Sequence, residues 1–254
     1  MTLRVVITGA SSGIGRALAA EYAQRGATLG LIARRSEALQ QLAGELKVPS
    51  AIYAVDVRDA AGLARAAEHF SGRFGMPDVV VANAGVSAGT LTEHVEDTAV
   101  FQEILDTNVV GLVNTFQPFI AALRVAHHGT LVGIASVAGF RGLPGASAYS
   151  ASKAAAITYL ESLRLDLHGT GVSVVTICPG YVATPMTERN PYPMPFMLPA
   201  AVAARRIANA IERRKRFVVI PWQMGMVGAV LKVLPRPLYD ALFAHAPRKP
   251  RRTI

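Results

Sequence analysis

Short runs of aliphatic and β-branched residues alternate along this chain with longer segments of helical periodicity, and this alternation constrains the fold more than any other feature. The runs are nearly continuous in apolar character, as at residues 79–81, which is typical of strands covered on both faces. The pattern predicts an α/β fold with one doubly wound, seven-stranded parallel sheet and helices on both of its faces. The expected strands are residues 3–8, 28–33, 50–55, 78–82, 130–135, 172–177 and 217–220.

The length of 254 residues and the composition, 51% hydrophobic and 17% charged, suit one large globular domain and exclude a disordered or disulfide-stapled chain. We expect residues 1–220 to form the α/β domain. Residues 221–254 should form an apolar and basic extension that packs on this domain or on a membrane surface. Within the domain, residues 181–199 hold five prolines and should form a loop or short turns rather than a regular helix.

The formal net charge of +9 is concentrated near the C-terminal end of the sequence. Residues 1–204 hold 14 basic against 15 acidic residues, whereas residues 205–254 hold 12 against 2, so the body is neutral and the last fifty residues are strongly basic. The single cysteine, Cys178, excludes an internal disulfide and fits a reducing compartment. With no leader pattern near Met1, we expect a cytoplasmic protein, or one that lies peripherally at the inner face of a membrane.

A glycine-rich turn joins the first expected strand to the first expected helix, residues 13–25. Glycines at this point permit a tight turn and let backbone N–H groups approach a pyrophosphate at the positive end of the helix dipole. The spacing G-x-x-x-G-x-G differs from the usual dinucleotide fingerprint, and a plain strand-to-helix connection is the alternative. The turn residues expected to bind a cofactor are Gly9, Ser11, Ser12, Gly13, Ile14 and Gly15.

Two arginines follow the second expected strand, where an acidic residue in NAD-selective folds would bind the ribose 2′-hydroxyl. A planar guanidinium can instead form two parallel hydrogen bonds with the 2′-phosphate of NADP. We therefore expect Arg34 to bind this phosphate, with Arg35 as the second candidate. The alternative is that both arginines are simply solvated at the start of a helix.

Tyr149 and Lys153 are four residues apart in an expected helix, residues 148–168, and so lie on one face, about 6 Å apart along its axis. A phenol has a pKa of about 10, and a neighbouring ammonium favours its ionised form. Tyr149 can therefore act as a general acid/base with Lys153 lowering its pKa. Ser136, directly after the fifth expected strand, can hold a substrate oxygen in place.

These motifs together resemble the short-chain dehydrogenase/reductase family, whose fold is Rossmann-like. The resemblance covers about residues 3–220. The matching segments are the turn from Thr8 to Gly15, the motif Asn83-Ala84-Gly85 after the fourth strand, the set Ser136, Tyr149 and Lys153, and the segment Pro179-Gly180 with Thr184 after the sixth strand.

The resemblance implies roles that the residues alone do not show. Asn108 would complete a catalytic tetrad by holding a water in a proton relay through Lys153. Lys153 would also contact the nicotinamide ribose. The further residues implied to bind the cofactor are Asp56 and Val57 at the adenine, the backbone of Asn83, Ala84 and Gly85 on the adenosine side, and Pro179, Val182 and Thr184 at the nicotinamide.

The loop after Thr184 is rich in methionine and aromatic residues, which suits an adaptable apolar pocket, although packing on the domain or on a dimer partner is the alternative. Met186 should lie nearest the substrate.

The uncharged run 217–231 is too short to span a bilayer, which takes about 20 apolar residues. With Trp222 and the cations Arg248, Lys249, Arg251 and Arg252, the tail suits an anionic lipid interface, and packing on protein is again the alternative.

No Cys/His spacing predicts a metal site, and no aromatic platform accompanies the basic residues to suggest nucleic-acid binding. The expected protein is an NADP(H)-dependent oxidoreductase that interconverts a small apolar ketone or aldehyde and the corresponding alcohol, as a homo-oligomer. A catalytically silent NADP(H) sensor, or a protein that associates with a membrane or partner through its tail, is the alternative.

Overall fold

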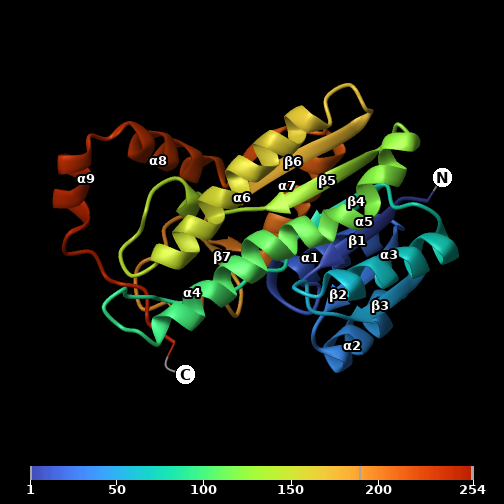
Figure 1. Cartoon of the computed structure of the whole chain (residues 1–254), viewed down its shortest axis with the longest axis horizontal. Helices are drawn as coiled ribbons and strands as arrows, with labels where there is room; N and C mark the ends of the chain where they lie inside the picture. The colour runs from blue at the N-terminus through green and yellow to red at the C-terminus, as the bar shows by residue number, and fades with distance from the viewer. Residues whose placement is uncertain (1, 189, 253–254) are drawn as a thin grey trace.

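The computed structural model describes residues 2–188 and 190–252, and it confirms the seven-stranded parallel sheet (Figure 1). The strands lie in the order β3-β2-β1-β4-β5-β6-β9, and each neighbouring pair is parallel. Their bounds, each within two residues of the expected ones, are β1 (Arg4–Thr8), β2 (Thr28–Ala33), β3 (Ser50–Ala54), β4 (Val79–Ala82), β5 (Gly129–Ile134), β6 (Val172–Pro179) and β9 (Phe217–Ile220).

Successive residues of each strand face opposite sides of the sheet, and both sides are covered by helices. Val5 and Ile7 of β1 belong to a core with helices α1, α2 and α7, whereas Val6 belongs to a core with α3, α5 and α6. Burial on both faces explains why the strands are continuously apolar in sequence. The helices of these two layers are α1 (Gly13–Gln24), α2 (Ser36–Leu46), α3 (Ala60–Phe74), α5 (Gly111–Val125), α6 (Ser147–Asp166) and α7 (Ala200–Glu212).

Four further segments lie around the carboxyl ends of the strands. Helix α4 (Asp97–Leu105) continues through a single π-helical turn, η1 (Asp106–Val110), into α5. A short 3-10 turn, η2 (Val137–Gly139), follows β5. The proline-rich region forms turns and a small ladder between β7 (Val182–Ala183) and β8 (Leu198–Pro199), as its prolines predict.

The uncharged run 217–231 spans two elements of the fold. Its first residues form β9 at the edge of the sheet, and the rest forms α8 (Trp222–Val233), followed by α9 (Arg236–Phe243). Helices α8 and α9 project at one end of the molecule, and the chain then returns toward α4 (Figure 1). Among the described residues, no helix is long and apolar enough to cross a bilayer.

Two of the four basic residues at the end of the tail pair with carboxylates of the domain, which favours the alternative of packing on protein for this part of the tail. Arg251 forms ion pairs with Glu96 and with the buried Asp97, and Arg252 pairs with Glu103, all in or next to α4. The tail packs on protein here because α4 presents carboxylates that satisfy these cations.

Candidate active site

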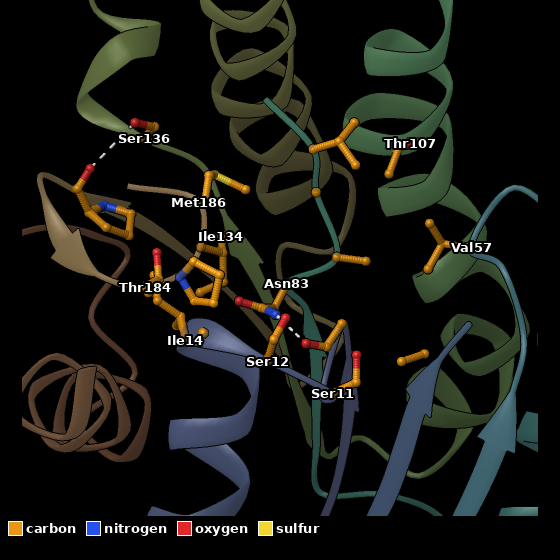
Figure 2. A pocket seen from close by; sticks show the side chains of 18 of the residues that line it. Ser11, Ser12, Ile14, Val57, Asn83, Thr107, Ile134, Ser136, Thr184 and Met186 are labelled. Atoms are coloured by element: carbon orange, nitrogen blue, oxygen red, sulfur yellow. Dashed lines mark hydrogen bonds between the residues drawn. The ribbon is translucent and has the colours of Figure 1, made fainter. Parts of the chain in front are cut away.

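A cavity of about 330 Å³ lies at the carboxyl ends of the strands, beside the point where the strand order reverses between β1 and β4. This is where doubly wound sheets bind ligands. Figure 2 shows Ser11, Ser12 and Ile14 below, with Val57 at the right of the view and Ser136 at the left. The predicted residues that line the cavity are Gly9, Ser11, Ser12, Gly13, Ile14, Arg34, Arg35, Asp56, Val57, Asn83, Ala84, Gly85, Ser136, Tyr149, Lys153, Pro179, Val182, Thr184 and Met186. The predicted residues Gly15 and Asn108 lie outside this lining.

The glycine turn forms a cradle that side chains would fill. Gly9 and Gly13 have positive φ angles of 67° and 55°, which favour glycine. A Cβ on Gly15 would collide with the backbone of Gly9 and with the side chain of Asn83. The missing Cβ of Gly15 thus lets α1 begin directly against the turn, so its N-terminal N–H groups face the cavity as a pyrophosphate requires.

The ends of β1 and β4 are tied together by side chains whose structural role the sequence did not reveal. Asn83 donates from Nδ2 to the Thr8 carbonyl at 2.9 Å, and the Thr8 hydroxyl accepts from the N–H groups of Asn83 at 3.1 Å and Ala84 at 3.2 Å. The Asn83 side chain therefore fixes the backbone that lines the cavity.

Arginines lie at the end of the cavity that follows β2. Arg35 donates to the Ser11 hydroxyl at 3.1 Å, which links the second strand to the glycine turn. Arg34 lies 3.9 Å from Asp56, while Arg58 binds the same carboxylate at 2.7 Å and holds its pKa below the ordinary value. Within the described chain, the Arg34 guanidinium makes only this longer contact, and its side chain is largely exposed.

Helix α6 brings Tyr149 and Lys153 to the inner end of the cavity, next to Ser136. Lys153 donates from Nζ to the Ile134 carbonyl at 2.8 Å, and its Nζ lies 5.8 Å from the centre of the Tyr149 ring. Burial lowers the pKa of Lys153 to about 8. Burial also raises the pKa of Tyr149, and a hydrogen bond with Ser136 partly offsets that rise.

Asn108 lies behind the cavity wall in the π-helical turn η1. Its side-chain amide accepts from the Val86 N–H at 2.8 Å and donates to the Val86 carbonyl at 3.0 Å and to Ser152 at 2.9 Å. A Cβ on Gly85 would lie 3.1 Å from the Asn108 Oδ1 and 3.5 Å from the Lys153 Nζ, so the two side chains approach one another across this glycine.

Of the methionine and aromatic residues in the loop after Thr184, Met186 lines the cavity, whereas Tyr192, Met194, Phe196 and Met197 do not. Its segment is held by Thr187, whose hydroxyl donates to the Val182 carbonyl at 2.7 Å and accepts from the Thr184 N–H at 3.0 Å. Thr187 itself lines the cavity and was missed, because a lone threonine in a loop carries no signal of its own.

Comparison with known proteins agrees with this geometry. Residues 4–193 match the family model for short chain dehydrogenase. An uncharacterised oxidoreductase of Myxococcus xanthus is 40% identical over 93% of this chain and 94% of that protein. The 11-beta-hydroxysteroid dehydrogenase 1A of Arabidopsis thaliana is 34% identical over 85% of this chain and 68% of that protein.

Among solved structures, the alcohol dehydrogenase of the archaeon Thermococcus sibiricus, complexed with 5-hydroxy-NADP, superimposes with a TM-score of 0.77. It is 25% identical, and the match covers 87% of this chain and 96% of that one. Fold, cavity, family model and relatives agree, and the chain belongs to the short-chain dehydrogenase family of oxidoreductases.

Proposed function

We propose that this protein is an NADP(H)-dependent oxidoreductase that interconverts a ketone or aldehyde with the corresponding alcohol. The observation that carries the proposal is the meeting of Ser136, Tyr149 and Lys153 at the inner end of a cavity whose outer end is basic. Residues 1–220 would form the catalytic domain, and residues 221–254 an extension of it.

When bound, the nicotinamide cofactor supplies or accepts the hydride. The Tyr149 hydroxyl would donate a proton to the substrate oxygen during reduction, and the Tyr149 phenolate would accept the alcohol proton during oxidation. Ser136 hydrogen-bonds the same oxygen and stabilises the charge that develops on it. An ammonium has three donors, of which the Ile134 carbonyl uses one, so Lys153 retains donors for the cofactor ribose. Asn108 would support the proton path behind Lys153.

The cofactor preference is proposed from the adenosine end. Arg34 and Arg35 line the cavity there, and a guanidinium suits a 2′-phosphate better than a 2′-hydroxyl. The complex of the Thermococcus sibiricus enzyme with 5-hydroxy-NADP supports this choice.

Replacing Tyr149 by phenylalanine tests the proposal. Tyr149→Phe should lower turnover about 10²- to 10⁴-fold, the range of a lost general acid/base, while NADPH binding measured by fluorescence titration persists. Tyr159→Phe is the matched control, because Tyr159 lies on the same helix outside the cavity lining. Equal turnover in Tyr149→Phe and wild type would refute the assignment. A wild-type protein that binds NADPH but reduces no ketone or aldehyde would be the silent sensor.

The substrate is proposed to be small and apolar, because Met186 lines the cavity beside the reacting groups. The hydroxysteroid dehydrogenase named among the relatives supports this class. A panel of long-chain, cyclic and steroid ketones, followed by NADPH absorbance, tests it, and a preference for short sugars would contradict it.

Helix α8 supports a further proposal, peripheral contact with an anionic membrane. Trp222, Met226, Val230 and Val233 are all exposed and recur at helical spacing, so they form one apolar face. A Trp222→Ala/Met226→Ala variant should lose flotation with anionic liposomes, whereas Val125→Ala, exposed on α5, should not. Unchanged flotation would contradict the proposal. A second copy of the chain covering this face would appear instead as a dimer whose light-scattering mass falls in the double variant.

A further inference from the structure

The segment 248–252, which we call the strap, runs along the rim of the active site after α9. The Gly89 N–H donates to the Pro250 carbonyl at 2.8 Å, and the Lys249 N–H donates to the Pro144 carbonyl at 3.3 Å. A Cβ on Gly89 would lie 2.5 Å from the Pro250 carbonyl oxygen, and one on Gly145 would lie 2.8 Å from the Lys249 backbone nitrogen. The strap is therefore fitted closely against the loops that precede α4 and α6.

An ion pair at Asp97 holds the strap in place. Arg251 donates from Nε and from a terminal nitrogen to the two oxygens of Asp97, at 2.8 and 3.0 Å, and the Leu91 N–H donates to the same carboxylate at 2.7 Å. Asp97 is only 3% exposed, so its charge depends on these donors. This two-point pairing fixes the position of the neighbouring strap residue, Lys249.

The Lys249 side chain turns inward, toward the catalytic tyrosine. Its Nζ lies 5.8 Å from the centre of the Tyr149 ring, the same separation as that of the Lys153 Nζ. It donates to the Asn190 side-chain carbonyl at 3.2 Å, in the loop that follows Met186. Lys249 thus joins the strap to the loop expected to close over the substrate.

Lys249 differs from Arg251 and Arg252 in its partners. Arg251 and Arg252 each pair with carboxylates. In the described chain no carboxylate pairs with Lys249, and its Nζ donates instead to the neutral side-chain amide of Asn190. Burial lowers its pKa, so the site bears the cost of holding this cation partly out of water. A ligand anion would compensate that cost.

We infer that Lys249 is a specificity-determining residue that binds a carboxylate of the substrate, which would be an apolar oxo acid or hydroxy acid. The inference rests on the proposed function, because it concerns the substrate of the same site. The reacting oxygen would contact the Tyr149 hydroxyl. The Lys249 Nζ lies 5.8 Å from the centre of the same ring but outside the cavity lining, so the substrate carboxylate would extend from the reacting carbon out of the cavity toward the strap. The apolar chain between or beyond these groups would lie toward Met186.

The test compares substrates that differ only in charge. We would assay 4-, 5- and 6-oxodecanoate and their methyl esters with NADPH, using wild type, Lys249→Met and Lys249→Arg. Arg248→Met is the matched control, because it removes the same charge from an exposed neighbour in the strap. Wild type should prefer at least one acid to its ester. Lys249→Met should raise the KM for that acid about 30-fold or more, as expected for loss of a buried charge pair, with kcat little changed.

The ester should be turned over equally by wild type and Lys249→Met, and Lys249→Arg should retain much of the preference for the acid. Acid and ester falling together in Lys249→Met would show that Lys249 only closes the loop through Asn190, and would overturn the inference. No preference for any acid in wild type would overturn it as well.

Binding of decanoate to the NADPH-loaded protein, measured by calorimetry, provides a readout that needs no turnover. Decanoate should bind wild type and Arg248→Met and should bind Lys249→Met much more weakly, and equal binding to all three would contradict the inference. The proposed function fails separately, if Tyr149→Phe reduces the esters as fast as wild type does.

Discussion

Replacing Arg34 by alanine should weaken NADPH binding much more than NADH binding. The Arg34 side chain is 61% exposed, and its distance of 3.9 Å to Asp56 is too long for a hydrogen bond. No strong internal contact must therefore break when it turns to a 2′-phosphate. A hydrogen bond to a charged group contributes about 1.5–3 kcal/mol. This range corresponds to a roughly 10- to 150-fold higher Kd for NADPH in Arg34→Ala.

The assay is fluorescence titration of both cofactors at one fixed ionic strength, because salt screens exposed charges. NADH has a 2′-hydroxyl at this position, so its Kd should change only slightly. Arg16→Ala is the matched control, since Arg16 is an exposed cation of α1 that pairs with Glu45 outside the cavity lining. Arg35→Ala should also weaken NADPH binding, but it loses the bond to Ser11 as well and so should affect both cofactors.

Equal loss of affinity for NADPH and NADH in Arg34→Ala would refute the reasoning, because it would show that Arg34 shapes the site without touching the 2′-phosphate. The reasoning would also be refuted if Arg34→Ala raised the Kd for NADPH no more than Arg16→Ala does. That result would show that Arg34 acts only through the overall charge of the protein.

Two further predictions concern stability. Leu160 is fully buried on α6 against Gly133 of β5. Leu160→Ala should therefore lower the free energy of unfolding, measured in urea, by about 2.7–5 kcal/mol. Leu165 is 68% exposed on the same helix, so Leu165→Ala should change this free energy by no more than about 0.5 kcal/mol. The hydrogen bond from Arg251 lowers the pKa of Asp97 in the folded protein. The pair therefore stabilises the fold at pH values above the ordinary carboxyl pKa of about 3.9. This stabilisation is lost as the pH falls through the lower pKa of the folded state. Asp97→Asn should therefore melt below wild type at pH 7, and the difference should narrow as the pH falls below about 3.9. A difference in melting temperature that stays constant on acidification would contradict the ionic explanation.

The sheet and the centre of the site could be predicted because their signals are local. Each strand can be recognised from its own apolar run, without reference to the rest of the chain. The glycine turn and the Tyr149–Lys153 pair each lie within a few residues of sequence. Parallel topology then brings the ends of these segments to one edge of the sheet, so their assembly required no knowledge of side-chain packing.

What the sequence did not reveal depends on contacts between distant residues. The tie between Thr8 and Asn83 spans 75 positions, and neither residue differs from an ordinary turn residue in sequence. The π-helical turn at Asn108 has the composition of normal helix. The basic tail was open to a lipid interpretation because its partner carboxylates lie more than 100 positions earlier, at Asp97 and Glu103.

The strap also has a consequence for the order in which the molecule opens and closes. Its bond from Arg251 to Asp97 joins positions 154 residues apart, and it packs on loops rather than in either core of the sheet. Contacts of such separation form after the local ones, and peripheral segments unfold locally at low free energy. The Gly89 amide, whose recorded acceptor is the strap's Pro250, should exchange its hydrogen with solvent through this local opening, long before the amides of β1 do so through global unfolding.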